Sequence, residues 1–261
     1  MPAEGNITGR SEAQWQAVLA CRRRTAPLYG AGELAELYGS LCAIPAGQSF
    51  AVAHLAQSLD GRIATASGAS QWISGDEDLR HTHRMRALAD AVVVGADTIL
   101  HDDPLLTVRR CAGPNPVRVV IDPDRRLKAD HRVFTDASAP TLVVVADDCA
   151  NGLALGAAEI IHLPRVDGIL SPRAIRRALA ARGLHWLFIE GGGVTISHFL
   201  RTRCLDRLQL TIAPMILGSG RPSLNLPVID APDLGLRPQI RRIALGQDVL
   251  FECIFGDRDE D

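Results

Sequence analysis

Three consecutive glycines, residues 191–193, stand between an apolar run and a segment with helical character. The run Trp186–Ile189 predicts a buried strand, and residues 194–200 predict a helix. Glycine lets a backbone approach an anion closely, and the first turn of a helix offers free N–H groups at the positive end of its dipole. The segment therefore fits a phosphate or pyrophosphate. The alternative is a tight turn that needs glycine only for its geometry.

Glu190 stands directly before these glycines, at the carboxyl end of the predicted strand. Ligands of open α/β sheets bind at such ends, and a carboxylate there can accept hydrogen bonds from an amino group. A solvated acid at the end of a strand is the competing interpretation. The glycines do not form the Gly-x-Gly-x-x-Gly fingerprint and lie late in the chain, so a standard Rossmann domain is disfavoured.

Two further loops contain groups suited to binding. Residues 58–72 form a polar, glycine-containing loop that ends in Trp72, a side chain that could cover a flat ring or pack in the core. Residues 98–109 contain Asp102 and Asp103 before a proline; two acids are a weak metal signal, and capping or binding of ribose hydroxyls suits them better. Arg86 and Arg109 lie near these loops and could clamp a phosphate, although isolated arginines are usually surface residues.

Strands that alternate with helices must position these loops, which predicts an α/β fold with a mainly parallel sheet covered on both faces. The expected strands are residues 50–55, 91–95, 117–121, 141–145, 186–189, 208–213 and 249–254. Ser74 and Glu77 form a Ser-x-x-Glu capping box that predicts a helix over 75–89, and Ser171-Pro172 opens another that ends by Gly183. The last two strands have no clear helix between them, which favours an antiparallel edge.

Residues 1–47 differ from the rest and predict an N-terminal helical extension, with short helices over 11–21 and 34–41; residues 48–261 then form the main domain. The 261 residues are 47% hydrophobic and 22% charged, with a formal net charge of −2. This balance offers no global field for nucleic acid or a membrane surface, and no run is long enough to span a bilayer. Six cysteines without a Cys-x-x-Cys pair indicate free thiols in a reducing cytoplasm and no metal site.

Seven separated motifs together resemble the reductase domain of bacterial bifunctional riboflavin biosynthesis proteins, the RibD C-terminal, dihydrofolate-reductase-like family. The resemblance covers about residues 50–255. The motifs are Ser-Leu-Asp-Gly-Arg at 58–62, Ser-Gly-x-Ser-x-Trp-Ile at 67–73, Arg-Ala-x-x-Asp-Ala at 86–91, Asp-Asp-Pro-x-Leu-Thr-Val-Arg at 102–109, Pro-Val-Arg-Val-Val-Ile-Asp at 116–122, Glu-Gly-Gly at 190–192 and Ala-Pro-Met-Ile-Leu-Gly at 213–218.

The resemblance implies a dihydrofolate-reductase-like fold, with a mixed, mostly parallel sheet flanked by helices, and an NADPH-dependent reductase that converts the ribosyl group of a ribosylaminopyrimidine 5′-phosphate to ribityl. The residues it places at NADPH are Ala56, Trp72, Thr98, Asp102, Pro123, Gly192, Gly193, Val194, Thr195, Ile196, Ser197 and His198. Those it places at the substrate are Ser70, Arg86, Leu106, Arg109 and Glu190, with the arginines near the phosphate. Asp60 or Glu190 could orient the pyrimidine or stabilise a cationic imine. The proton donor stays open, since water or the substrate's own hydroxyls could serve. A homodimer is also implied by resemblance only.

The chain departs from the bifunctional family members because it lacks the His-x-Glu and Pro-Cys-x-x-Cys motifs of their zinc deaminase. His81 and His83 are two residues apart on a predicted helix, which makes a poor metal pair. The resemblance supports the reaction type better than the exact pyrimidine. Two alternatives remain: an NADPH-dependent reductase of another heterocycle, such as a dihydropterin or folate, and a non-catalytic nucleotide-binding module.

Overall fold

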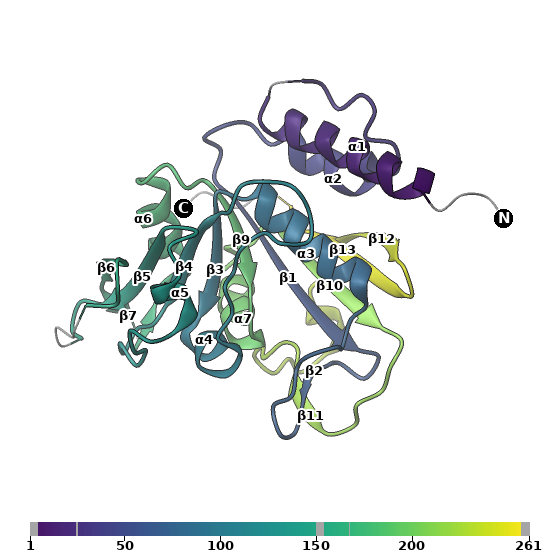
Figure 1. Cartoon of the computed structure of the whole chain (residues 1–261). Helices are drawn as coiled ribbons and strands as arrows, with labels where there is room; N and C mark the ends of the chain where they lie inside the picture. The colour runs from purple at the N-terminus through teal and green to yellow at the C-terminus, as the bar shows by residue number, and fades with distance from the viewer. Residues whose placement is uncertain (1–4, 25, 150–153, 167, 257–261) are drawn as a thin grey trace.

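A nine-stranded sheet forms the centre of the molecule (Figure 1). The computed structural model describes residues 5–24, 26–149, 154–166 and 168–256. The spatial order of the strands is β12-β13-β10-β1-β9-β3-β4-β5-β6, and all strands from β10 to β6 are parallel. Their bounds are Phe50–Ser58 (β1), Ala91–Gly95 (β3), Val117–Ile121 (β4), Thr141–Ala146 (β5), Glu159–Leu163 (β6), Trp186–Glu190 (β9), Arg207–Ala213 (β10), Gln239–Leu245 (β12) and Asp248–Ile254 (β13). β13 runs antiparallel to both β10 and β12, so the predicted parallel sheet with an antiparallel C-terminal edge is confirmed.

Alternate residues of the central strands build two hydrophobic cores, one on each face of the sheet. Val92 and Phe188 enter the core that α3 (Asp76–Leu88) covers, whereas Val93 and Ile189 enter the core that α6 (Pro172–Ala180) and α7 (Gly193–Arg201) cover. Successive side chains of a strand point to opposite faces, so a strand buried on both faces must be apolar throughout. This explains why short continuous apolar runs predicted these strands.

Strand β9 lies between β1 and β3, although it follows both much later in the chain. The connections that leave β1, β9 and β3 therefore diverge from one point on the carboxyl edge of the sheet. Ligands of α/β proteins bind in the crevice that such a divergence creates. The three loops singled out in the sequence all begin at this edge.

The capping box predicted at Ser74 is wrong. The helix begins one residue later, with Gly75 in the N-cap position and no side-chain cap. The N–H of Gly75 donates to Asp248 Oδ2 at 2.7 Å, and the Glu77 carboxylate pairs with Arg80 at 2.8 Å. A partner from a strand distant in sequence thus replaces the local cap. Glu77 binds Arg80, one turn further along the helix, and does not accept a hydrogen bond from the backbone at the helix start.

Several elements were not expected from the sequence. They are the edge strands β6 and β12, the small pairs β2 (Arg62–Thr65) with β11 (Gly220–Pro222) and β7 (Arg165–Val166) with β8 (Ile169–Leu170), and the short helices α4 (Ala96–Asp102) and α5 (Arg132–Thr135). Edge strands are solvated on one side, so charged residues interrupt their apolar pattern, as Arg241 and Arg242 do in β12.

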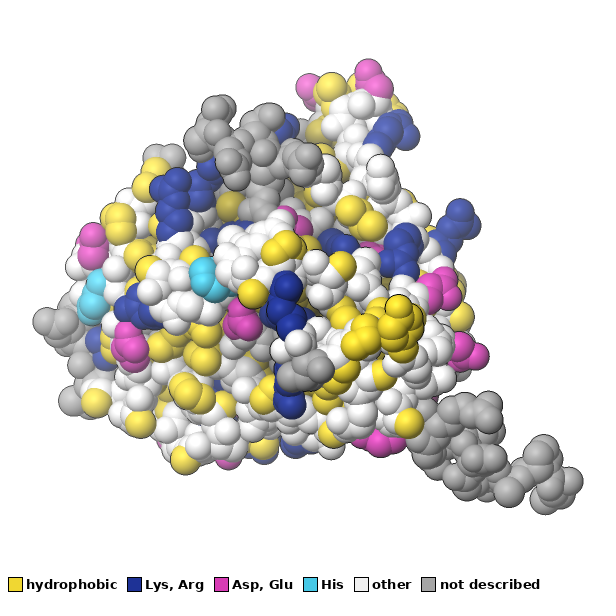
Figure 2. Space-filling view, turned by 90° about the horizontal axis from the view of Figure 1, so that it is seen from above, with side chains coloured by type: hydrophobic (Ala, Val, Ile, Leu, Met, Phe, Trp, Pro, Cys, Tyr) yellow, Lys and Arg dark blue, Asp and Glu magenta, His cyan; other side chains and the backbone are white. Residues whose placement is uncertain are grey.

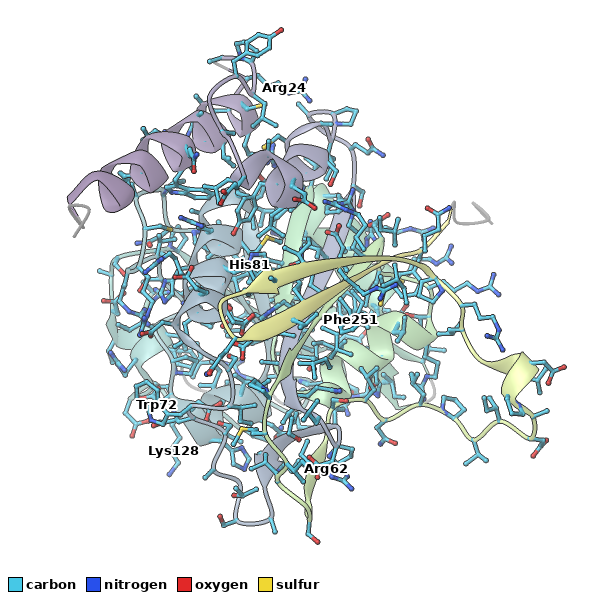
Figure 3. All side chains as sticks on the ribbon, turned by 90° about the vertical axis from the view of Figure 1, so that its right-hand side faces the viewer. Arg24, Arg62, Trp72, His81, Lys128 and Phe251 are labelled. Atoms are coloured by element: carbon cyan, nitrogen blue, oxygen red, sulfur yellow. The ribbon has the colours of Figure 1, made fainter. Side chains whose placement is uncertain are left out.

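The first two helices, α1 (Gly5–Arg22) and α2 (Leu34–Cys42), share the core of α3 through Trp15 and Tyr38. The indole N–H of Trp15 donates to the Ala112 carbonyl at 2.7 Å, and its ring makes an edge contact with Tyr38. Figures 1 and 3 show these helices, with Arg24, at the end of the molecule opposite β2 and Trp72. They therefore pack against the domain away from the carboxyl edge of the sheet.

Charge is mixed over the surface: in Figure 2, Lys and Arg side chains are scattered among Asp and Glu on the face shown. Within the described part of the chain, no helix has the length and hydropathy that a bilayer crossing requires.

Candidate active site

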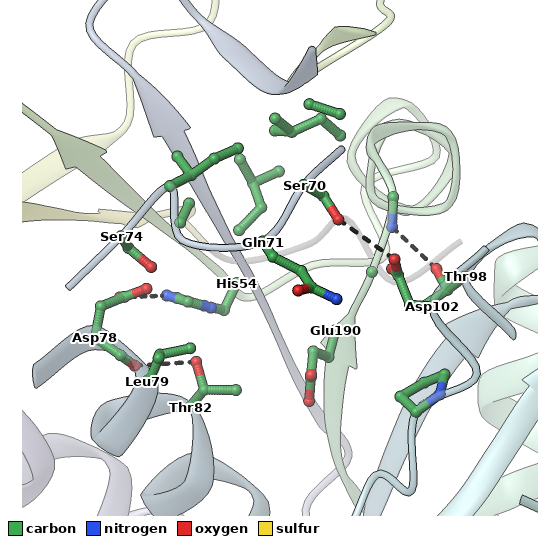
Figure 4. Close-up of a pocket in the computed structure, with 18 of the residues that line it drawn as sticks. His54, Ser70, Gln71, Ser74, Asp78, Leu79, Thr82, Thr98, Asp102 and Glu190 are labelled. Atoms are coloured by element: carbon green, nitrogen blue, oxygen red, sulfur yellow. Dashed lines mark hydrogen bonds and ion pairs between the residues drawn. The ribbon is translucent and has the colours of Figure 1, made fainter. Parts of the chain in front are cut away.

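A cavity of about 500 Å³ opens at the carboxyl ends of β1 and β9 (Figure 4). Its walls come from these two strands, from α3, from the loop that contains residues 70–74, and from α4 with the loop that follows it up to residue 110. The sequence-predicted residues that line it are Ala56, Ser70, Trp72, Arg86, Thr98, Asp102, Leu106, Arg109, Glu190 and Gly192. Residues far apart in the chain thus meet at one cavity.

Glu190 and Arg86 form an ion pair on the wall of this cavity. The guanidinium grips both carboxylate oxygens: Arg86 Nε donates to Oε2 at 2.7 Å and Nη2 donates to Oε1, while Nη1 donates to the Thr107 carbonyl at 2.9 Å. Burial alone would raise the pKa of the Glu190 carboxyl, but the charge and hydrogen bonds of Arg86 hold it below its usual value. Glu190 is therefore an anion whose charge Arg86 balances. It is not the free strand-end acid that the sequence left open.

This pairing changes the prediction that Arg86 and Arg109 clamp a phosphate together. The Arg86 guanidinium is committed to Glu190 and Thr107. Arg109 contacts Thr107 through Nη1, and no described residue accepts from its Nε or Nη2. Burial, and then the nearby charge of Arg86, lower the pKa of Arg109. A cation held in such surroundings is stabilised by an incoming anion, so Arg109 is the better phosphate ligand of the two.

A second cavity, of about 410 Å³, adjoins the first and shares Thr98 and Gly192 with it. Among the predicted cofactor residues it is lined by Pro123, Gly193, Val194, Thr195 and His198. The N-cap of α7 is Gly192, which brings no capping side chain, so the first N–H groups of the helix are left for a ligand. The residues present thus fit a dinucleotide phosphate.

Gly192 and Gly193, at the start of α7, are glycine for different structural reasons. A Cβ added to Gly193 would lie 2.2 Å from the Ser223 carbonyl oxygen, so only glycine permits that close approach. A Cβ added to Gly192 would meet nothing within 4 Å and would project into open space between the cavities. Gly193 is thus required by packing, whereas Gly192 keeps room beside the helix start.

The predicted cofactor segment does not contribute to this cavity along its full length. Ile196 is fully buried in the core, and Ser197 Oγ accepts a hydrogen bond from the Asn225 N–H at 2.7 Å. A helix turns each residue by about 100°, so a continuous run such as 192–198 cannot face one ligand. The side chains that do face the second cavity are Val194, Thr195 and His198.

Asp60 does not line either cavity. Its carboxylate accepts hydrogen bonds from Ser58 Oγ at 2.6 Å and from the N–H groups of Leu217 and Gly218 at 3.0 and 2.7 Å. These bonds, that from Ser58 first, lower the pKa of Asp60 to about 2. The residue ties the end of β1 to the loop after β10. This geometry favours a structural role over the catalytic role expected for it.

Trp72 lies on the rim of the first cavity and is 77% exposed, so the core-packing interpretation of this residue is wrong. Ser70 Oγ donates to Asp102 Oδ1 at 3.3 Å, and the Gly192 N–H makes a long contact of 3.5 Å with Thr98 Oγ1. These contacts join the loop of Ser70 to α4, and α4 to the glycine turn (Figure 4).

Among the lining residues of the first cavity that the sequence analysis did not assign to the site are His54 and Asp78. His54 Nε2 and Asp78 Oδ1 are 3.0 Å apart, and both side chains are buried. A histidine inside the apolar run of β1 was the available signal. The described residues contain no group of three or more His, Cys, Asp and Glu side chains arranged to hold a metal ion.

A mostly parallel sheet with two adjoining cavities at its carboxyl edge defines a class of protein, the α/β proteins that bind ligands where the strands end. The family model described as the RibD C-terminal domain matches residues 50–245. The chain therefore belongs to the RibD C-terminal domain family, and the sequence-based predictions of the family and of a reductase are confirmed.

Named relatives agree with this assignment. The chain is 36% identical over 215 residues to 2,5-diamino-6-ribosylamino-4(3H)-pyrimidinone 5′-phosphate reductase of Methanothermobacter thermautotrophicus. The match covers 78% of this chain and 96% of that protein. It is 33% identical to the riboflavin biosynthesis protein RibD of Aquifex aeolicus over 70% of this chain, but it covers only 49% of that longer protein.

Among solved structures, the chain resembles a diaminohydroxyphosphoribosylaminopyrimidine deaminase/5-amino-6-(5-phosphoribosylamino)uracil reductase from Thermotoga maritima. The TM-score is 0.69 at 26% identity, and the match covers 87% of this chain and 62% of that one.

The Arg86–Glu190 pair makes a prediction about stability. Arg86→Met removes the cation at similar volume and leaves a largely shielded carboxylate unpaired, which should lower the free energy of unfolding by about 3 kcal/mol near neutral pH. The unpaired Glu190 then has a raised pKa, so its penalty should shrink as pH falls and it becomes protonated. In the wild type the pKa is depressed, and the stabilisation from this group is instead lost on acidification.

Urea unfolding of both proteins near neutral and mildly acidic pH would measure this difference. Arg80→Met is the matched control, because Arg80 pairs with Glu77 on the exposed surface and should cost less than about 1 kcal/mol. Equal stabilities for the two variants at neutral pH would contradict the account of the buried pair.

Proposed function

We propose that this protein uses NADPH to reduce the ribosyl group of a ribosylaminopyrimidine 5′-phosphate to ribityl, a step of riboflavin biosynthesis. The observation that carries the proposal is the pair of adjoining cavities. One offers an uncapped helix start suited to a pyrophosphate, and the other offers Arg109 with the Arg86–Glu190 pair. The name of the Methanothermobacter relative, of which this chain covers nearly the whole length, supports the same substrate class.

The second cavity is the proposed NADPH site. Gly192, Gly193 and the following N–H groups of α7 would hold the pyrophosphate, and Thr195 and His198 would line the path of the adenosine half. Thr98 and Gly192 belong to both cavities, so the nicotinamide would reach the substrate beside them. When bound, NADPH supplies a hydride; the protein's task is to orient the two ligands and to exclude water.

The first cavity is the proposed substrate site. Arg109 would bind the 5′-phosphate, and Ser70 and Glu190 would bind polar groups of the pyrimidine. Glu190 can accept hydrogen bonds from ring amino or N–H groups while Arg86 holds its carboxylate in a fixed plane. Asp60, which braces the loop at the end of β1, would support this site from outside it.

We further infer that the protein acts in the cytoplasm as a homodimer, with residues 1–47 as an extension of the 48–261 reductase domain. Support for the dimer comes from exposed apolar side chains on the edge strand β12 and in the chain segment that precedes it. Val228, Leu236 and Ile240 are among the most exposed large hydrophobic residues of the described chain. A second copy would cover them.

The direct test follows NADPH oxidation with 5-amino-6-ribosylaminouracil 5′-phosphate and with its 2,5-diamino precursor, using dihydrofolate as the comparison. Turnover of either ribosylaminopyrimidine above dihydrofolate supports the proposal, and the ratio of the two identifies the preferred pyrimidine. Folded protein that binds NADPH and turns over neither pyrimidine would refute it.

Gly192→Val should separate cofactor binding from folding. The added side chain meets no protein atom near its Cβ, so thermal stability should change little, but it enters the space proposed for the pyrophosphate. We expect at least about a tenfold loss of NADPH affinity, equivalent to about 1.4 kcal/mol. Titration of the protein with NADPH, followed by its fluorescence, gives both dissociation constants. Glu190→Gln is the matched variant on the substrate side and should bind NADPH nearly as the wild type does; unchanged NADPH affinity in Gly192→Val would remove the cofactor from this turn.

Arg109→Gln should act on the substrate alone. Loss of a charge-assisted contact to the phosphate should raise the substrate KM by roughly tenfold or more, with NADPH affinity unchanged. The same substitution should hardly affect a substrate that lacks the 5′-phosphate. An equal loss with phosphorylated and dephosphorylated substrates would show that Arg109 does not bind the phosphate.

A further inference from the structure

His54 occupies a position in the cavity wall that the proposed function has not used. It lies on β1 directly opposite Glu190 in the register of β1 with β9. Its Nε2 bonds Asp78 Oδ1 at 3.0 Å, and Thr211 Oγ1 donates to the same carboxylate oxygen at 2.6 Å (Figure 4). The side chain is only 5% exposed, so its hydrogen bonds fix its orientation. No described residue hydrogen-bonds the other ring nitrogen, Nδ1.

The charges around His54 favour its protonated form. Asp78 on α3 and Glu190 on β9 are the anions that face it, Arg86 and His81 on α3 are the cationic or ionisable groups, and Thr211 on β10 is neutral. Burial alone would lower the pKa of His54, but the charge and hydrogen bond of Asp78, helped by Glu190, raise it above its usual value.

The neighbouring His81 is held in the opposite state. Tyr38 Oη lies 2.8 Å from His81 Nδ1, and His81 Nε2 lies 2.9 Å from Gln209 Oε1. The Gln209 amide donates to Glu252, a buried carboxylate that Arg207 and Arg241 also bind, so the Gln209 oxygen is left to accept from His81. Burial raises the pKa of the Tyr38 phenol, which therefore stays protonated and donates to Nδ1.

These bonds assign one tautomer to His81, with its proton on Nε2 and a lone pair on Nδ1. Burial, and then the charge of His54, lower the pKa of His81 to about 4. The rings of His54 and His81 are in edge contact, with centroids 5.5 Å apart. Two touching histidines are thus driven apart in charge state, a pattern that marks functional acids and bases. The groups around the histidine on the cavity wall favour its protonated form, whereas those around the other favour its neutral form.

We propose that His54 is the acid of the reaction: its Nδ1–H protonates the ring oxygen of the ribosyl group as the bond between that oxygen and C1 breaks. Tyr38, from the N-terminal extension, is a positioning residue that acts through His81. The proton goes from His54 to the oxygen, which becomes a hydroxyl, and the electron pair of the broken bond stays with that oxygen. The exocyclic nitrogen donates its lone pair to C1 to give an iminium ion, whose C1 would accept the hydride that NADPH supplies when bound. The proposal rests on the proposed function.

The first test needs neither substrate nor cofactor. Nuclear magnetic resonance of protein with labelled histidine side chains should show His54 titrating above ~6.5, the usual pKa of histidine, while His81 stays neutral down to mildly acidic pH. Tyr38→Phe removes the donor to His81 Nδ1 and makes His81 easier to protonate, so the titration of His54 should move to lower pH. A His54 that titrates below ~6.5 in the wild type would overturn the proposal.

The second test measures turnover against pH. Since the acid must be protonated, kcat should fall as pH rises through the folded-state pKa of His54. In His54→Gln, kcat should drop by about 10²- to 10⁴-fold and this alkaline limb should disappear, with NADPH affinity retained. In Tyr38→Phe the limb should move to lower pH, an effect that a merely structural role for Tyr38 would not produce. His162→Gln is the matched control, because His162 is exposed on β6.

The outcomes separate the two proposals. A wild-type protein without turnover on any ribosylaminopyrimidine contradicts the proposed function, whatever the titration of His54 shows. A wild-type protein with turnover, whose alkaline limb and rate survive in His54→Gln, contradicts the role of His54 alone. If His54→Gln does not fold, the Tyr38→Phe profile decides: an unmoved limb overturns the proposal.

Discussion

The cost of burying charge organises the carboxyl edge of this sheet. Asp78 is buried and Glu190 is largely shielded from solvent, so an unpaired carboxylate at either position would be costly, and each is bonded to a basic side chain on a neighbouring element. Arg86 on α3 serves Glu190 on β9, and Asp78 on α3 serves His54 on β1. Helix α3 therefore supplies a cation, Arg86, to β9 and an anion, Asp78, to β1. These two bonded pairs fix the position of the helix over the two strands.

The same constraint assigns the roles of the arginines. Because Arg86 is bound on three of its nitrogens, its charge serves the protein, and the charge left for a ligand is that of Arg109. Arg86 and Arg109 thus differ in their capacity to bind a ligand. This difference depends on their hydrogen-bond partners, and their positions in the sequence do not predict it.

The N-terminal helices gain a chemical connection to the site through this packing. Tyr38 reaches His81 across the core that α2 shares with α3, and His81 touches His54. Helices that pack away from the cavity can therefore still influence the protonation of His54 in the cavity wall. The energy of a charge in a dry interior depends on neighbours at these distances more strongly than it would in water.

The sequence by itself determined the strands of the sheet other than its edges β6 and β12, and the glycine turn before α7, because strands buried on both faces must be apolar. Seven separated motifs matched one family, and several residues that this resemblance placed at the ligands line the first cavity. It also named Glu190, Arg109 and Gly192 for the site. Only the tertiary structure decided that Arg86 is paired, that Asp60 braces a loop, that Ile196 is in the core, and that Gly75 rather than Ser74 is the N-cap of α3. Each of these depends on a partner far away in the chain, such as Asp248 for Gly75 or Glu190 for Arg86, and local pattern does not encode which distant group will arrive. The pair of His54 and Asp78 was missed for the same reason. A histidine in an apolar strand can be recognised as a site residue only when the structure shows that α3 places the carboxylate of Asp78 against it.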